Sequence, residues 1–209
     1  MARFLITQSL LRSWLYVYEC YPGCEEDAMA SFLRTLKKEP DDLTEDQQQN
    51  IQNGIDFENA VYAEALGAVR EPHPKWEHGI QYVANFVKGA QFQVKAQRNL
   101  SVCGMDFLVY GILDGLKAGT IFDVKFKNKS FGSLDLAGEF FESPQHPLYF
   151  YLVPEAREFM YLVSDGADLY VERYTPDESP TAESLISEFV EFLKSSNLLE
   201  TYAQYWKTL

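Results

Sequence analysis

The spacing of apolar residues changes near residue 91, and this change limits the chain to folds that contain both helices and a sheet. Before that point, apolar side chains recur at intervals of three and four residues, which is typical of amphipathic helices. From residue 91 to about 175 they alternate, in stretches rich in Val, Ile, Phe and Tyr that turn residues separate. Helical spacing then returns. We therefore expect an α/β chain of the α+β kind, with a mixed sheet of about five strands flanked by helices.

The chain has 209 residues, of which 46% are hydrophobic, so it is long enough for a core that needs no disulfide or metal. We expect a single domain over 1–209, with a mainly helical part (1–90), a sheet with one inserted helix (91–175) and C-terminal helices (180–209). The helical N-terminal segment includes residues 4–20. A longer helix is expected after Thr44, because Thr44 and Gln47 have the spacing of a capping box.

Three charged residues lie in stretches that otherwise read as buried strands. Asp114 follows Leu113 near the end of one stretch, and the next contains Asp123 and Lys125. Side chains alternate across a strand, so Asp123 and Lys125 share a face, and a tight turn would bring Asp114 beside them. An unpaired buried charge costs several kcal/mol. Two interpretations stay open: a buried Asp–Lys ion pair with an acid in a turn, or acids that bind Mg²⁺ or Mn²⁺.

Two predicted helices carry further polar residues at regular spacing. Glu58 follows Gly54 by four residues, among apolar neighbours on the long helix. Gln145 and Tyr149 stand at positions i and i+4 of a short helix between the strands, so they share one helical face.

With these residues the chain resembles the PD-(D/E)XK nuclease superfamily, most closely its RecB-like exonuclease branch. The resemblance covers about residues 4–165 and depends on the order of four short motifs. They are Gly54 and Glu58 for the early helical acid, Gly111 and Asp114 for the strand acid, Asp123-Val124-Lys125 for the signature tripeptide, and Gln145 and Tyr149 for the later helix. The resemblance implies a restriction-endonuclease-like core.

It also implies a Mg²⁺-dependent deoxyribonuclease that hydrolyses phosphodiester bonds. By this resemblance, Mg²⁺ or Mn²⁺ ions would be held by Glu58, Asp114, Asp123 and the backbone carbonyl of Val124. Lys125 would orient the attacking water and stabilise charge in the transition state. Gln145 and Tyr149 would steady Lys125 or the DNA backbone, or would only pack against the sheet. Some relatives carry an iron–sulfur cluster, but this chain has no cysteine after Cys103, so we expect none.

The net charge of −13 argues against attraction of nucleic acid to the whole surface. A local DNA-binding entrance is expected at Lys117, Lys127 and Lys129, joined by Lys88, Lys95 and Arg98, although a solvated strand end explains the lysines equally well.

Three functions stay open. The first is a DNA exonuclease or end-processing nuclease in recombination, repair or phage DNA metabolism, acting on linear ends. The second is a non-catalytic acidic interaction or DNA-mimicking module, and the third a restriction-type endonuclease. No phosphate-binding loop of an ATPase is present, so unwinding would need a helicase or another recombination partner protein.

The three cysteines suit a reducing cytoplasm, and neither a secretory segment nor a membrane span is expected, so we predict a cytoplasmic protein. Cys103 is expected to be buried within a strand.

Overall fold

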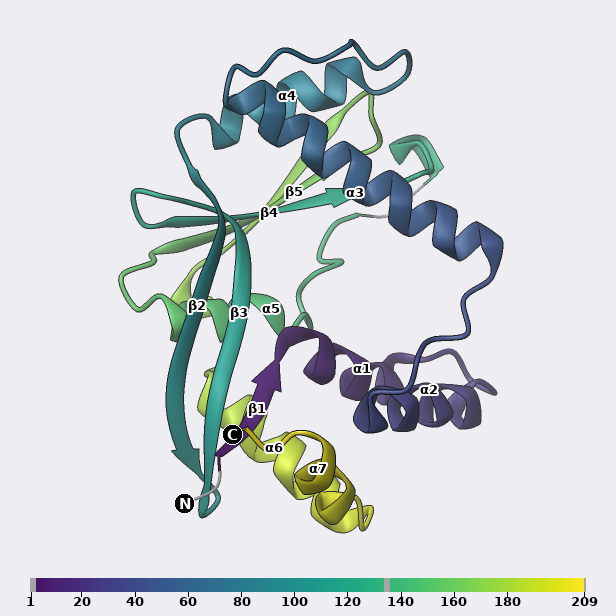
Figure 1. Ribbon diagram of the computed structural model, residues 1–209, viewed down its shortest axis with the longest axis vertical. Helices are drawn as coiled ribbons and strands as arrows, with labels where there is room; N and C mark the ends of the chain where they lie inside the picture. Colours follow the sequence, from purple (N-terminus) through teal and green to yellow (C-terminus); the bar gives the residue numbers. More distant parts are fainter. Residues whose placement is uncertain (1–2, 134–135, 209) are drawn as a thin grey trace.

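The computed structural model describes residues 3–133 and 136–208 as a mixed sheet with helices on both faces (Figure 1). Its elements are, in chain order, β1 (Arg3–Thr7), α1 (Gln8–Glu19), α2 (Glu25–Lys37), α3 (Glu45–Ala65), α4 (Glu77–Val87), β2 (Gln91–Val102), β3 (Met105–Lys117), β4 (Thr120–Phe126), η1 (Phe131–Ser133), α5 (Gln145–Leu152), β5 (Glu158–Ser164), β6 (Leu169–Tyr174), η2 (Pro176–Glu178), α6 (Ala182–Ser195) and α7 (Leu199–Tyr205). The expected α+β class with a mixed sheet is confirmed.

The sheet has six strands, in the order β1-β3-β4-β5-β6, and β2 pairs with the other edge of β3. β2, β3 and β4 form an antiparallel meander, and β5 and β6 form a hairpin. β1 pairs parallel to β3, and β4 pairs parallel to β5. The long strand β3 therefore joins the two halves of the sheet.

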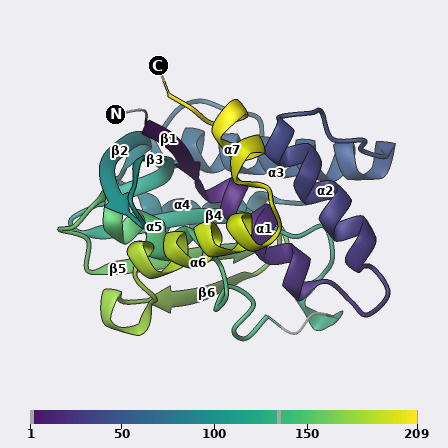
Figure 2. The same ribbon diagram turned by 90° about the horizontal axis from the view of Figure 1, so that it is seen from below.

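Helices cover the sheet in two layers with separate apolar cores. The larger core lies between the sheet and α1, α2, α5, α6 and α7, and the smaller one lies under α3 and α4. Figure 2 shows α6 and α7 on the near side of the sheet, with α3 and α4 behind it. In the part of the chain that the structure describes, every helix is too short or too polar to cross a membrane.

The sixth strand, β1, corrects one prediction. A helix was expected to begin at residue 4, but residues 3–7 are extended and the helix begins at Gln8. The apolar residues at the N-terminus form a strand because β1 pairs with β3 over five residues. Thr7 then caps α1 by accepting a hydrogen bond from Leu10 N at 3.3 Å. Pairing between distant segments here outweighs a local apolar pattern.

The other helices lie close to where their patterns place them. Thr44 and Gln47 form the predicted capping box at the start of α3. The inserted helix α5 begins at Gln145 after Pro144, as expected for a helix opened near that proline.

Cys103 was predicted to be buried in a strand, and this is wrong. It is exposed, with a positive φ of 52°, in the tight turn between β2 and β3. A turn of two residues must reverse the chain at this point, and the backbone conformation of that turn directs the Cys103 side chain into solvent.

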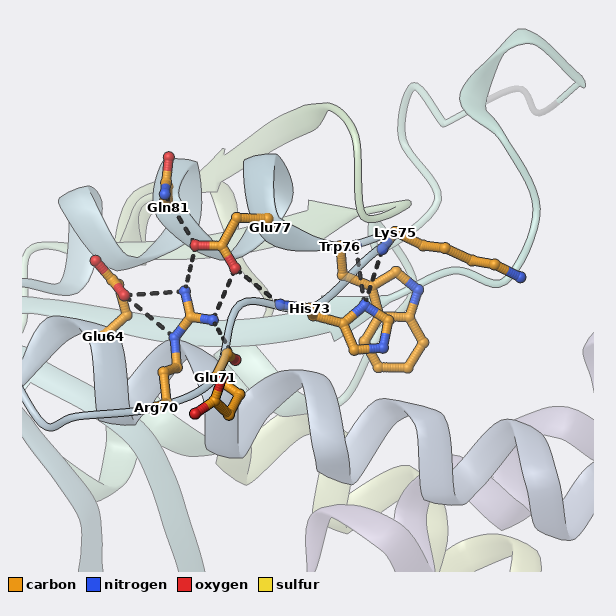
Figure 3. Close-up of polar contacts among 8 residues, drawn as sticks. All are labelled: Glu64, Arg70, Glu71, His73, Lys75, Trp76, Glu77 and Gln81. Carbon is orange, nitrogen blue, oxygen red and sulfur yellow. Dashed lines mark hydrogen bonds and ion pairs between the residues drawn. The ribbon is translucent and has the colours of Figure 1, made fainter.

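A charged network fixes the loop that joins α3 to α4 (Figure 3). Arg70 forms two hydrogen bonds of 2.8 Å with Glu77, and its guanidinium also lies 2.9 Å from Glu64. The hydrogen bonds from Arg70 lower the pKa of Glu77 to about 2. Glu77 also accepts a hydrogen bond from the backbone of His73, whose ring stacks on Trp76 with 3.9 Å between ring centroids. The end of α3 is thereby tied to the start of α4.

Candidate active site

The predicted site residues lie where the sheet divides. On one edge of β3, residues 106–110 pair with β1 and residues 115–117 pair with β4. Among the described residues, none of β1 or β4 pairs with residues 111–114 on that edge, because β1 has ended and β4 diverges from β3, as Figure 1 shows. Backbone groups at such a gap need other partners, and side chains supply them.

Two side chains satisfy the backbone at this gap. Asp114 Oδ2 accepts a hydrogen bond from Val124 N at 2.9 Å, and the Tyr149 hydroxyl donates to Ile112 O at 2.9 Å. Tyr149 packs so closely that a Cβ on Gly111 would lie 2.6 Å from its ring. A residue without a side chain is therefore needed at position 111. This contact with Tyr149 explains why the motif that ends in Asp114 begins with a glycine.

Asp123 is the most deeply buried charged group of the site. It is 1% exposed and lies on the α5 face of β4, while Val124 packs into the core under α3 and α4. Its Oδ1 accepts a hydrogen bond from Gln145, and its Oδ2 lies 2.7 Å from Lys125 Nζ. Oδ2 is nevertheless a buried atom that receives no well-directed hydrogen bond within the described residues. The Lys125 side chain is 36% exposed, so it links this acid to the surface.

Helix α5 therefore contacts both diverging strands. Gln145 binds the carboxylate on β4, and Tyr149, one turn later, binds the backbone of β3. Gln145 is buried, not partly exposed, and it contacts Asp123, whereas one expectation gave it the role of steadying Lys125. The neighbouring His146 is a packing residue: it stacks on Tyr174 at 4.2 Å, and burial lowers its pKa to about 4.

The surroundings of Asp114 and Lys125 shift the pKa values of both groups. Burial, then the charge of Asp123, then that of Glu58 raise the pKa of Asp114 well above its usual value. Burial lowers the pKa of Lys125, but the charges of Asp123 and Asp114 outweigh burial and raise it. At neutral pH Lys125 is thus a fixed cation, whereas the raised pKa of Asp114 opposes a second negative charge beside Asp123.

We expect Asp114→Asn to raise the melting temperature of the metal-free protein at neutral pH. Asn keeps an oxygen to accept the Val124 hydrogen bond but carries no charge. Folding raises the pKa of Asp114 above the usual value of 3.8. The contribution of Asp114 to the free energy of unfolding is therefore fully present below pH 3.8, and it is lost as the pH rises through the folded pKa. Thermal melting in EDTA from acidic to neutral pH should therefore show an advantage of the variant that grows with pH.

Asp165→Asn is the matched control with the opposite sign. Burial raises the pKa of Asp165, but hydrogen bonds from Asp168, Phe131 and Ala167 backbone N–H groups outweigh it and lower the pKa. Its stabilising contribution is present above the unfolded pKa, so Asp165→Asn should be less stable at neutral pH. Equal effects of pH on both variants would contradict the electrostatics described for Asp114.

Glu58 lies near this group but is held by other residues. Phe57 of α3 stacks on Phe126 of β4 at 4.7 Å, which places Glu58 beside the sheet. Its carboxylate accepts hydrogen bonds from Tyr62 and, at 2.9 Å, from Gln93. Its charge contributes to the raised pKa values of Asp114 and Lys125. Glu58 is therefore an electrostatic neighbour of the site.

Gln93 is a site residue that the sequence did not reveal. It lies opposite Asp114, between the pairs Phe92–Gly115 and Val94–Leu113, and has an unusual positive φ of 52°. Its side chain contacts Glu58 and Tyr62. Nothing in an alternating strand sequence signals a left-handed residue, because glutamine rarely adopts that conformation. Thr7, Gln8 and Ser9 were not predicted as site residues, but with Tyr149 they line a cavity of about 210 Å³ at the gap.

The donor groups fit a divalent cation in part. Between residues 3–133 and 136–208, no three acidic, histidine or cysteine side chains converge closely enough to hold a metal ion. The predicted set of Glu58, Asp114 and Asp123 is thus not assembled. Two carboxylates do come together, and the Asp123 Oδ2 atom without a hydrogen bond suits a cation, since hard cations prefer carboxylate oxygen. The Val124 carbonyl as a ligand stays a prediction.

The three predicted DNA-binding lysines do not form one cluster. Lys117 donates to Lys88 O at 2.6 Å near the turn before β4, whereas Lys127 and Lys129 follow β4 at its other end. A strand of this length separates the two ends by ~20 Å. Lys127 forms an ion pair with Glu139, and Lys129 is exposed. DNA contact by these lysines stays a prediction.

Comparisons with known proteins support the fold alone. No family model matches the sequence, and a search of curated proteins found no match. The crystal structure of SSO0001 is similar with a TM-score of 0.50 and 13% identity, and the alignment covers 93% of this chain and 77% of that one. The crystal structure of Rai1 from Scheffersomyces stipitis aligns with a TM-score of 0.39 and 16% identity, over 92% of this chain and 61% of that one.

Proposed function

We propose that this chain is a metal-dependent nuclease of the PD-(D/E)XK type that hydrolyses phosphodiester bonds in DNA. The observation that carries the proposal is the pairing of buried Asp123 with half-buried Asp114, with Lys125 at the exposed side of the pair, at a gap in the sheet. A cation bound between the two acids would offset the repulsion that raises the pKa of Asp114. The order of the four motifs along the chain supports the same assignment.

Each side chain has a separate task in this proposal. Asp114 and Asp123 would hold Mg²⁺ or Mn²⁺, and Glu58 would join them only if it left Tyr62 and Gln93. When bound, the cation would polarise the phosphate and lower the pKa of adjacent water. Gln145 fixes the orientation of Asp123 through its hydrogen bond.

Lys125 acts as a charged donor, not as a base. Its raised pKa keeps it protonated at neutral pH, so it cannot accept the proton of the attacking water. Its ammonium group, partly exposed, orients that water and meets the negative charge that develops on phosphate as the new P–O bond forms and the old one breaks.

A DNA-mimicking module is the weaker alternative. The net charge of −13 favours it, but a mimic presents its acids to solvent, whereas Asp123 is 1% exposed. The nuclease proposal explains this buried acid, and the mimic proposal gives it no use.

We expect purified protein with Mg²⁺ or Mn²⁺ to degrade linear DNA from its ends and to leave covalently closed circles intact. The assay uses end-labelled single- and double-stranded linear DNA beside a closed circle, so strand preference and polarity are read from the same gel. Parallel reactions with EDTA and with Asp123→Asn exclude a contaminating nuclease. Cutting of the circle as fast as linear DNA would favour the restriction-type endonuclease, and no cleavage of any substrate would contradict the proposal.

A further inference from the structure

An apolar groove with an acidic rim is lined by residues of α1, of α6 and of the segment around the start of α5, and it shares no side chain with the candidate active site. One part has a volume of about 660 Å³ and includes Trp14, Tyr18 and Phe192 in its lining. A second part of about 280 Å³ includes Phe141 and several prolines. Leu15, Glu142 and Glu188 line both parts, so we treat them as one surface, the α1–α6 groove.

Aromatic side chains line this groove, with Tyr18 and Phe141 exposed, Phe192 half-buried and Trp14 buried beneath them. Trp14, Tyr18 and Phe192 contact one another with ring centroids 5.9 to 6.2 Å apart. Tyr18 is 64% exposed and Phe141 is 61% exposed. Large apolar residues grouped in this way favour a binding surface, whereas isolated ones need no explanation.

Four of the five residues of α6 that line the groove form one row along the helix. Leu185, Glu188, Phe192 and Ser195 follow intervals of three and four residues, and Phe192 contacts Trp14 and Tyr18 of α1. The row is ~15 Å long at 1.5 Å per residue, which is two to three helical turns. A groove between two helices with this spacing fits the apolar stripe of a third helix.

The acidic residues of the rim favour a positively charged binding partner. Its charged residues are Glu19, Glu142, Glu178, Glu188 and Glu191, and neither part is lined by a lysine or arginine. Glu19 pairs with Arg12 and Glu191 with Lys194, and Glu178 caps η2, whereas Glu142 and Glu188 form no ion pair within the described residues. Nucleic acid and anionic lipid would be repelled, and a second copy of this chain would bring the same acids face to face.

We propose that the α1–α6 groove docks a basic amphipathic helix of a partner protein. Apolar side chains of that helix would cover Tyr18, Phe141 and Phe192, and its lysines or arginines would meet Glu142 and Glu188. This inference does not depend on the nuclease activity, because the groove shares none of the catalytic side chains.

The test uses a fluorescent peptide of about 18 residues, with Leu at every third and fourth position and Lys elsewhere. A scrambled peptide has the same composition without the stripe, and a third peptide has Glu in place of Lys. Fluorescence anisotropy should show the striped basic peptide binding at least about tenfold more tightly than either control, because only it combines both features. Equal affinity for the striped and scrambled peptides, or no binding of the striped one, would overturn the proposal.

Variants locate the binding. Tyr18→Ala and Glu188→Lys should each weaken binding by about tenfold, and both positions are exposed, so the fold should be retained. Tyr21→Ala and Glu155→Lys remove the same groups at exposed positions outside the groove, and they should bind like the parent. Equal losses for Glu188→Lys and Glu155→Lys would mean attraction by net charge alone and would overturn the proposal. A dimer in sedimentation that Tyr18→Ala dissociates would assign the groove to a second copy instead.

Discussion

The Asp123→Asn variant is expected to cleave DNA about 10³-fold more slowly than the parent while it keeps its fold. The substitution keeps an oxygen that can accept the Gln145 hydrogen bond but removes the carboxylate charge. A metal ion contributes several kcal/mol of transition-state stabilisation, and each ~1.4 kcal/mol is a factor of ten in rate. The measurement is single-turnover cleavage of a short labelled duplex in saturating Mn²⁺.

Glu172→Gln is the matched control for Asp123→Asn. Glu172 is also a buried acid of the same sheet, 8% exposed, but it accepts hydrogen bonds from Tyr174 and from Phe140 N. This variant should cleave at nearly the parent rate. If Asp123→Asn cleaved like the parent, or if both variants lost activity equally, Asp123 would have no place in the chemistry.

The second large effect is expected for Lys125→Met, which should lower single-turnover cleavage by about 10²-fold or more. Removing one charged or hydrogen-bonding stabiliser of a transition state has effects on this scale. Met has a similar length and leaves the apolar part of the side chain in place, so folding should be retained once Mn²⁺ occupies the acids. Thermal melting with and without Mn²⁺ measures the effect on folding separately from the effect on the cleavage rate.

Lys194→Met provides the comparison, because Lys194 also pairs with an acid, Glu191, but lies on the surface of α6. It should change neither cleavage nor melting appreciably, as is usual for an exposed ion pair. If Lys125→Met had the same melting temperature and cleavage rate as Lys194→Met, the Asp123–Lys125 contact would be an ion pair without a role in catalysis.

Local patterns predicted most of the fold, because helices and hairpins depend on residues that are near in sequence. The capping box of Thr44 and Gln47 marked the start of α3, and the change to alternating apolar residues marked β2, β3 and β4. β1 was missed because its pairing partner, β3, lies about a hundred residues further along the chain. No local pattern of five residues distinguishes such a strand from the first turn of the helix that follows it.

The sequence predicted the positions of the site residues on the strands, but not those that depend on packing between distant elements. Strand alternation correctly placed Asp123 beside Lys125 and opposite Val124, and the tight turn brought Asp114 to the same point. The positions of Glu58 and Gln93 could not be predicted, since they depend on how α3 packs across β2 and on a left-handed residue within a strand. Sequence spacing specifies which face a residue occupies, but not which partner its side chain binds.

Calorimetric titration with Mn²⁺ tests the central claim most directly, because it measures cation binding without reference to any DNA substrate. The parent is expected to bind Mn²⁺, and Asp114→Asn and Asp123→Asn should each weaken the binding at least about tenfold, since each removes one carboxylate that prefers a hard cation. Affinity should also rise with pH as Asp114 ionises, because its raised pKa makes proton and metal compete. Equal Mn²⁺ affinity in the parent and both variants would contradict a metal site at the gap in the sheet.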